Sequence, residues 1–311
     1  MDVIDDIRQS DAEYPNVVMT VGSFDGIHLG HRSILERVVS KAQEIGGTPA
    51  VLTMRPHPRE YFAPEHAPNL LTSFKKKCQL IEEAGVEVLY VLPFDRDAAN
   101  MEPQVFVQEI LSGRCHAKAV VVGHDCRFGK GAQGDVEFLE KAGPEYGFTV
   151  EEVPPLIVDA ERVSSTLVRE RVIQGDLASV ETLLGRKYSV IGEVQSGRGI
   201  GATIGFPTAN IKPDHSAVPA QGVYIAEAVL DGRRFPAAVN IGIAPTIRHE
   251  DVTIEAHLLD FSEDITGSEI EIVFHRRIRP EKKFGSREEL QEQIGRDVEA
   301  VRAHFRHNPN G

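Results

Sequence analysis

The stretch Val21-Gly22-Ser23-Phe24-Asp25-Gly26-Ile27-His28-Leu29-Gly30-His31 decides how the first half of the chain folds. It follows an apolar run over 17–21, which predicts a buried strand, and precedes a run over 31–45 whose apolar residues recur at helical spacing. A turn of this kind directs backbone N–H groups and the positive end of a helix toward an anion. His28 and His31 are three residues apart, so both lie near the first helical turn. The stretch therefore predicts a site for a nucleotide phosphate.

Composition limits the class of protein. The 311 residues favour two domains, and 41% hydrophobic with 26% charged residues suits ordinary soluble cores. No apolar run is long enough to span a membrane, and the acidic start 1–6 is not a secretory signal. The three cysteines are scattered, which excludes a disulfide framework. We therefore expect a cytoplasmic protein.

The net charge of −13 disfavours nucleic acid and anionic membranes as partners. It also repels nucleotides, so a phosphate site needs local N–H groups, a few basic side chains and a divalent cation. We therefore expect Mg²⁺ to be required. Nothing in the sequence indicates the oligomeric state.

Strand-like and helix-like runs alternate from residue 17 to about 148. The further strands are expected at 48–54, 86–92, 117–123 and 148–153, and the further helices at 74–84, 103–111 and 135–142. Uninterrupted apolar strands separated by helices predict a Rossmann-like α/β domain, in which helices cover both faces of a parallel sheet. Ligands bind such sheets beyond the carboxyl ends of the strands. The turns after Val21, Met54 and Val122 all fall at that end.

The pattern changes after two short helices expected at 164–175 and 176–184. Short strands then follow at 188–195, 222–230, 234–241, 253–259 and 269–278. The Asp231-Gly232 pair predicts a hairpin, and Ser286 with Glu289 predicts a capping box that opens a helix to about Phe305. We therefore expect an antiparallel β-barrel, or else a sandwich, with a C-terminal helix. The predicted domains are 1–184 and 185–311.

Three further segments of the first half carry candidate ligand-binding residues. Pro56-His57-Pro58 follows the second strand, Asp125 follows a later one, and Ser164-Ser165-Thr166 opens a helix. Hydroxyl residues at a helix N-terminus can hold phosphate, and Arg169 adds a charged donor. Taken alone, the hydroxyl run also fits plain N-capping, and the proline segment fits a rigid loop.

These segments resemble, in order, those of the adenylyltransferase module of bifunctional bacterial FAD synthases, which belong to the nucleotidyltransferase superfamily. The resemblance implies that FMN is joined to the α-phosphate of ATP and that pyrophosphate is released. It implies that His28 and His31 stabilise the transition state. The other implied contacts are Gly22, Phe24, Ser164, Ser165, Thr166 and Arg169 to ATP, and Pro56, Pro58 and Asp125 to the flavin.

Three residues depart from the family pattern on the flavin side. His124, Cys126 and Ala132 stand where the family has other residues. They leave open an alternative, a monofunctional kinase whose first domain binds flavin or ATP without turnover.

The second half opens on a glycine-rich segment, Gly197–Asn210. The backbone N–H groups of Gly199, Gly201 and Gly205 can wrap phosphates, although a long hairpin loop would also use glycines. Thr208 and Asn210 alternate on one side of an extended segment, where a hydroxyl and an amide oxygen suit Mg²⁺; a β-bulge is the alternative. Glu255 alternates with apolar neighbours, which fits either a catalytic base or an exposed strand residue.

The segment G-F-P-T-A-N at 205–210 resembles the signature of riboflavin kinase. The resemblance implies phosphorylation of riboflavin by ATP to FMN. It implies that Glu255 is the base for the ribityl hydroxyl and that Thr208 and Asn210 hold Mg²⁺ and the ATP phosphates. Together the two resemblances imply a bifunctional enzyme that makes FMN and then FAD. A third alternative is a non-catalytic flavin sensor.

Overall fold

The protein is described by a computed structural model that defines residues 1–197, 201–214, 217–245 and 250–307. The chain divides into two compact units. The first unit contains Met1–Pro68 and Phe74–Ser164, and the second contains Asn69–Ser73 and Ser165–Gly311. The domain ranges expected from the sequence concern the two activities, and they stay a prediction.

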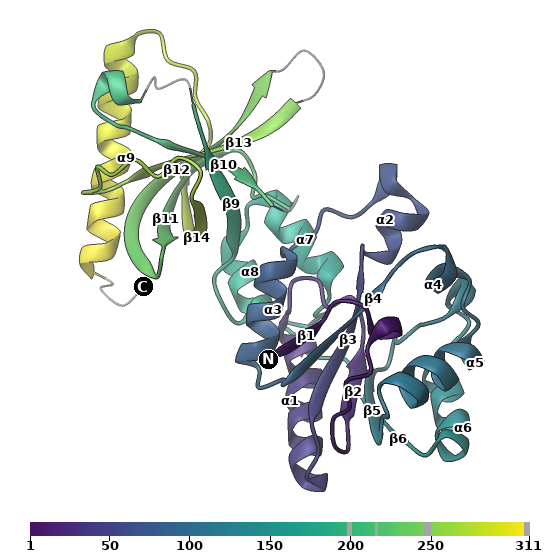
Figure 1. The fold of residues 1–311 in the computed structure, drawn as a ribbon. Helices are drawn as coiled ribbons and strands as arrows, with labels where there is room; N and C mark the ends of the chain where they lie inside the picture. Colours follow the sequence, from purple (N-terminus) through teal and green to yellow (C-terminus); the bar gives the residue numbers. More distant parts are fainter. Residues whose placement is uncertain (198–200, 215–216, 246–249, 308–311) are drawn as a thin grey trace. The chain divides into compact units, whose positions relative to one another are not determined.

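A six-stranded parallel sheet forms the centre of the first unit (Figure 1). In spatial order its strands are β1 (Asp2–Ile4), β4 (Val88–Pro93), β3 (Pro49–Arg55), β2 (Val18–Val21), β5 (Ala119–Gly123) and β6 (Thr149–Val153). The predicted Rossmann-like sheet is confirmed. Only β1 lacks a sequence prediction, because three residues are too short to show a periodic pattern.

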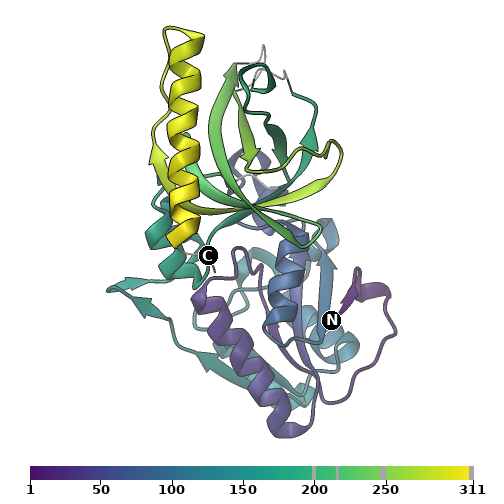
Figure 2. The same ribbon diagram turned by 90° about the vertical axis from the view of Figure 1, so that its left-hand side faces the viewer.

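Helices cover both faces of this sheet (Figures 1 and 2). One face carries α1 (Leu29–Ile45) and α3 (Phe74–Glu83), and the other carries α6 (Val136–Tyr146) and α5 (Pro103–Val105) with η3 (Phe106–Arg114). The remaining elements are η1 (Ile7–Gln9), α2 (Pro58–Phe62), η2 (Pro64–His66), α4 (Arg96–Asn100), η4 (Lys130–Ala132), β7 (Ile157–Val158) and β8 (Glu161–Arg162).

Both faces of the central strands are buried, which explains their uninterrupted apolar sequences. Leu52 and Tyr90 pack with the helices of one face, whereas their chain neighbours Val51 and Leu89 pack with Leu35 of α1 on the other. The helix predicted over 103–111 is partly wrong in type. It begins as α5 but continues as the π-helical η3, where the Cys115 N–H donates to the Ile110 carbonyl at 2.9 Å.

The second unit is a closed six-stranded barrel preceded by two helices. The helices are α7 (Ser165–Gln174) and α8 (Leu177–Leu184). The strands, in order around the barrel, are β10 (Ala209–Pro213), β13 (Glu250–Leu258), β12 (Arg233–Pro245), β11 (Gly222–Leu230), β14 (Glu269–Arg279) and β9 (Ser189–Gln195). The barrel is closed by pairing of β10 with β9, which confirms the barrel and excludes the sandwich.

The C-terminal helix α9 (Arg287–His307) lies along the outside of the barrel (Figure 2). Val298 and Val301 of α9 pack against Ile225 and Ala238 of the barrel wall. Ser286 accepts from the Glu289 N–H at 3.1 Å, as predicted. The second hydrogen bond of the predicted capping box is not the one expected. The Glu289 carboxylate accepts from the Gly285 N–H, at 3.0 Å, and not from the N–H of the capping residue Ser286.

Among the described residues, no helix is both long and apolar enough to cross a membrane.

Candidate active sites

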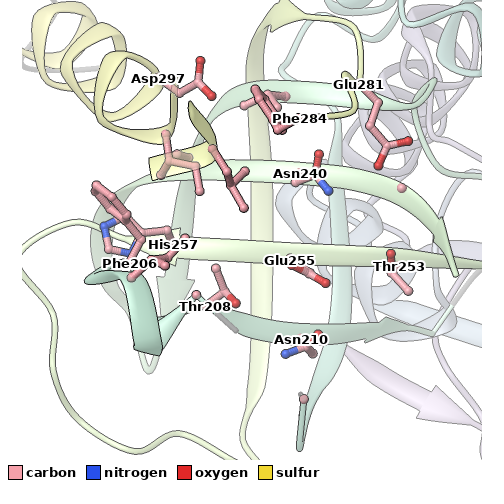
Figure 3. Close-up of a pocket in the computed structure, with 18 of the residues that line it drawn as sticks. Phe206, Thr208, Asn210, Asn240, Thr253, Glu255, His257, Glu281, Phe284 and Asp297 are labelled. Carbon is pink, nitrogen blue, oxygen red and sulfur yellow. The ribbon is translucent and has the colours of Figure 1, made fainter. Parts of the chain in front are cut away.

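A cavity of about 810 Å³ lies in the second unit between the barrel wall and α9. Barrel strands, the η5 segment (Ala202–Ile204), residues 279–284 and α9 all contribute to its lining. Four residues selected from the sequence line it, namely Gly201, Thr208, Asn210 and Glu255. Figure 3 shows the last three side by side. The segment Gly205–Asn210 and the glutamate are about 50 residues apart in the chain, so the fold of the barrel brings them together.

One row of cross-strand neighbours forms the wall of the cavity. Glu255 pairs with Asn210 on one side and with Asn240 on the other. Asn240 pairs in turn with Val223, which pairs with Arg279. Directly paired residues project from the same face of a sheet, so this row presents its side chains to one cavity. Figure 3 shows Glu255 between the two asparagines on neighbouring strands.

This row settles where the Glu255 side chain lies. Its neighbours Ile254 and Ala256 are fully buried on the opposite face, whereas Glu255 is half-buried and lines the cavity. A carboxylate beside two amides and the Thr208 hydroxyl can accept a proton from an alcohol, and its oxygens suit a hard cation.

The glycine-rich segment approaches the same residues closely. A Cβ on Gly197 would stand 1.8 Å from Asn210 Nδ2, and one on Gly201 would stand 2.2 Å from the Phe206 carbonyl oxygen. Side chains at these two positions would collide, so the glycines allow close backbone approach and do more than lengthen a hairpin. Gly205 has φ +85°, a left-handed backbone conformation that glycine adopts more readily than other residues do. The predicted phosphate-binding Gly199 lies outside the described residues.

An ion pair between Arg279 and Asp297 lies at the α9 side of the cavity, and no pattern in the sequence predicted it. Asp297 is 3% exposed, and both of its oxygens accept from the Arg279 guanidinium, the shortest contact being 2.8 Å from Nη2 to Oδ2. Gln293 also donates to Asp297, at 3.1 Å. Sequence reasoning missed Asp297 because it looks like any polar residue on an amphipathic helix.

The strand-to-helix turn of the first unit places the two predicted histidines in contact. His28 caps α1, and its Nδ1 accepts from the His31 N–H at 3.2 Å. The two imidazoles are stacked with ring centres 3.7 Å apart, and the Phe24 ring lies 5.0 Å from that of His31. A Cβ on Gly22 would stand 3.1 Å from the Phe24 ring, so glycine gives this ring its space.

Burial lowers the pKa of His31 well below its usual value, with smaller contributions from the charges of His28 and Lys77. His31 is therefore neutral at pH 7. Its Nδ1 is buried and has no hydrogen-bond partner among the described residues. An orphaned buried nitrogen at a helix N-terminus fits a site that is completed by a polar ligand.

Lys77 of α3 was also missed by the sequence analysis, in which it is one of three consecutive lysines. Its ammonium donates to the Ser23 carbonyl at 2.6 Å, so it reaches the turn from a distant part of the chain.

The predicted flavin-binding residues lie at the carboxyl edge of the same sheet. Pro56 follows β3 through a cis peptide bond, and Pro58 begins α2. Asp125 follows β5 and accepts a hydrogen bond from Arg162. The Asp125 side chain is 62% exposed, so it is open to a ligand.

Two of the departing residues are partly buried, and the third is exposed. Burial raises the pKa of the Cys126 thiol to about 12, which keeps it protonated and unreactive. The His124 side chain is 28% exposed, and Ala132 is exposed with φ +57°.

The hydroxyl residues lie at the boundary between the two units. Ser164 ends the first unit, directly after Val163, whose carbonyl oxygen would be 3.7 Å from a Cβ on Gly30. The chain before Ser164 therefore passes beside the first turn of α1. Ser165 and Thr166 begin α7 in the second unit, where Arg169 donates to the Asn69 carbonyl at 2.7 Å.

Two family models match the chain. The model for FAD synthetase matches residues 10–167, and the model for riboflavin kinase matches residues 184–305. The chain belongs to the bifunctional riboflavin kinase/FMN adenylyltransferase family. Both family domains are present in one chain, which favours the bifunctional interpretation over the monofunctional alternative.

Full-length relatives support this membership. The bifunctional riboflavin kinase/FMN adenylyltransferase of Haemophilus influenzae is 38% identical over 98% of this chain and 99% of its own. The Escherichia coli and Bacillus subtilis enzymes of the same name are 37% and 36% identical, over 95% and 93% of both chains respectively.

A solved structure shares the fold. A crystal structure described as a macrolide-efflux protein from Streptococcus pneumoniae superposes with a TM-score of 0.86 at 29% identity, covering 96% of this chain and 98% of that one.

Proposed function

We propose that this chain makes FMN at the barrel and FAD at the parallel sheet, with residues 1–184 carrying the adenylyltransferase and 185–311 the kinase. The observation that carries the proposal is the row of Asn210, Glu255 and Asn240 on one cavity wall, in a chain whose other unit holds a stacked histidine pair. One site offers a base, and the other offers helix N–H groups and a stacked pair of imidazoles, of which that of His31 is neutral. Two different phosphate chemistries need these two arrangements.

In the kinase reaction the ribityl 5′-hydroxyl of riboflavin attacks the γ-phosphorus of ATP, and ADP leaves. A neutral alcohol is a poor nucleophile and must lose a proton as the new bond forms. Glu255 accepts that proton. The backbone N–H groups of Gly199, Gly201 and Gly205 surround the ATP phosphates, and Thr208 with Asn210 orient them.

Mg²⁺ fits the residues at this wall. The Thr208 hydroxyl and the Asn210 amide oxygen are oxygen ligands, which Mg²⁺ prefers together with substrate phosphates. Among the described residues, no cluster of three or more His, Cys, Asp or Glu forms a ready-made metal site. A cation shared with ATP is therefore a better fit than a resident one. Mg²⁺ held by Thr208 and Asn210 would supply positive charge to neutralise the phosphoryl group that is transferred.

In the adenylylation reaction a phosphate oxygen of FMN attacks the α-phosphorus of ATP, and pyrophosphate leaves. This nucleophile is ionised at pH 7, so the site needs alignment and charge stabilisation instead of a base. His28 and His31 stabilise the transition state. Gly22, Phe24, Ser164, Ser165, Thr166 and Arg169 hold ATP, and Pro56, Pro58 and Asp125 contact the flavin.

The test is a time course. Purified protein is incubated with riboflavin, excess ATP and Mg²⁺, and the flavins are separated by chromatography. We expect FMN to rise first and FAD to follow. Accumulation of FMN without FAD, under reducing conditions as well, would reject the adenylylation activity. It would show that the first unit only binds flavin or ATP.

The same proposal places the protein in the cytoplasm, where riboflavin and ATP are available, with no nucleic acid or membrane as partner. The excess of acidic residues supports this, because it repels polyanions and anionic lipid surfaces. Fractionation of cells followed by immunoblotting tests it, and we expect the chain in the soluble fraction.

A further inference from the structure

The turn between β2 and α1 adopts an unusual backbone conformation. Phe24, Gly26 and Ile27 have φ values of +49°, +86° and +40°, all in the left-handed region. For a phenylalanine and an isoleucine this conformation is costly and persists only where the surroundings hold it. Phe24 and Ile27 are both at most 2% exposed, so part of the restraint comes from packing.

Lys77 provides a polar restraint on the same turn from another helix. Its ammonium donates to the Ser23 carbonyl at 2.6 Å, and the Thr53 hydroxyl approaches the same oxygen at 3.4 Å. Ser23 is the residue directly before the first left-handed position. The hydrogen bond therefore fixes the start of the turn that carries His28 and His31.

The charge of Lys77 also acts on this turn. Burial lowers the pKa of Lys77, and the nearby Asp25 carboxylate opposes that shift. Other charged or titratable groups around it include Cys78, Glu60, Arg55 and His57. Its charge contributes to the lowered pKa of His31, after burial and His28. In a chain of net charge −13, a half-buried cation beside a phosphate-binding turn opposes the general repulsion of nucleotides.

We propose that Lys77 is a positioning residue of the adenylylation site, whose ammonium fixes the phosphate-binding turn through Ser23 and places a positive charge near His31. This inference rests on the proposed function of the first unit. Lys77 acts through the turn and through the histidine, and it needs no direct contact with the substrate.

Three substitutions in the full-length protein separate the two contributions of Lys77. Lys77→Met removes both the charge and the donor, Lys77→Gln keeps a donor without the charge, and Lys77→Arg keeps both. We expect Lys77→Met to slow FAD formation from FMN by about 100-fold, because a small displacement of the residues that position the reactants can cost that much. In Lys77→Gln the rate of FAD formation should remain at least about tenfold below that of the unmodified protein. Lys77→Arg should recover most of the lost rate, because it keeps the charge and the donor.

A second readout does not depend on turnover. The imidazole of His31 is titrated by NMR in histidine-labelled protein and assigned by comparison with His31→Gln. Because Lys77 lowers the pKa of His31, that pKa should rise in Lys77→Met and Lys77→Gln and return in Lys77→Arg. A purely structural lysine would not produce this pattern.

The matched control is Lys141→Met, which removes an exposed lysine of the same unit that pairs with Glu137 one helical turn away. It should leave FAD formation and the titration unchanged. FMN formation by the same preparations reports an intact second unit. If Lys77→Met fails to fold, the Gln and Arg variants still decide the matter.

Two outcomes would overturn the proposal. They are FAD formation by Lys77→Gln equal to that of the unmodified protein, or a His31 titration that is the same in all variants. Failure of the unmodified protein to form FAD would instead reject the proposed function, while the titration would still test the charge of Lys77.

Discussion

At the scale of single residues, Glu255 and the histidine pair lie in chemically different surroundings. Glu255 lies between two amides on the wall of an open cavity. His28 and His31 are stacked at the start of a helix, where burial keeps His31 neutral. The first setting suits the proposed base, and the second suits the proposed stabilisation of charge. We therefore expect removal of each residue to affect one reaction only.

Replacing Glu255 by glutamine should abolish the kinase reaction selectively. The variant keeps the shape of the side chain but cannot accept a proton, so FMN formation should fall by at least about 100-fold. FAD formation from added FMN should be unchanged. The control is Glu263→Gln, an exposed residue outside the cavity lining. Equal loss of both reactions in Glu255→Gln would argue against separate sites.

Replacing both His28 and His31 by alanine should have the opposite effect. The change removes the imidazoles and the His28 cap of α1, so FAD formation should fall below detection. Loss of an N-cap costs about 1 kcal/mol, which a domain of this size can tolerate. Riboflavin phosphorylation by the same preparation is measured as the control. Retention of FAD formation would show that the histidines are structural.

At the scale of elements, polar contacts along its length fasten α9 to the barrel, and two of them involve β14. Asp297 pairs with Arg279 of β14 beside the cavity. At the other end of the helix, His304 Nε2 lies 3.1 Å from His275 Nδ1 of β14. The cavity is therefore formed partly by a helix whose docking depends on polar contacts with β14 as well as on apolar packing.

Asp297→Ala should loosen α9. It leaves the Arg279 guanidinium without its partner, and breaking a pair of this kind costs about 3 kcal/mol. Amide hydrogen exchange over 287–307 should become faster. Glu292→Ala on the same helix breaks only a surface pair with Arg296, and should change little. Equal exchange in the two variants would show that the buried pair does not hold the helix.

The contact between His275 and His304 predicts a pH dependence. Burial lowers the pKa of His275 to about 4, with Lys187, His304 and Arg234 adding to the shift, whereas the unfolded chain titrates near its usual value of 6.5. Between these pH values the unfolded state binds the extra proton, so stability falls as pH decreases from 6.5 toward 4. Urea unfolding across this range should show that slope.

His275→Gln should flatten the pH dependence, because glutamine does not titrate. His116→Gln, at a histidine with a 48% exposed side chain in the other unit, is the control. An unchanged slope in His275→Gln would assign the acid sensitivity to other groups.

At the scale of the whole molecule, the second unit extends beyond the barrel. It includes α7 and α8, and Leu177 and Val180 of α8 are buried. Residues 69–73 also belong to it, since the Ala217 N–H donates to the Leu70 carbonyl at 3.0 Å. The riboflavin kinase model matches from residue 184 only. The folding unit is therefore larger than the span that the family model matches.

A fragment of residues 165–311 should therefore be more stable than one of residues 185–311. The shorter fragment loses α7 and α8 and exposes the surface of β14 that α8 contacts. Its melting temperature, followed by circular dichroism, should be lower by more than about 10 °C. Equal melting temperatures would show that the barrel and α9 form an independent domain.

The sequence alone determined the two fold types and most of their elements. Apolar runs without alternation predicted the parallel sheet, and short strands with turn residues predicted the barrel, because these periods reflect how each element is buried. Local motifs also identified Glu255, Thr208, Asn210 and the histidine pair as candidates.

Only the tertiary structure decided which distant residues share a site. Asn240 and Arg279 join Glu255 through the strand register of a closed barrel, and Asp297 joins them through the docking of α9. Lys77 reaches Ser23 across 54 positions of the chain. No local pattern encodes these contacts. They follow from packing and register between elements, which depend on the whole core and not on the period of any one segment.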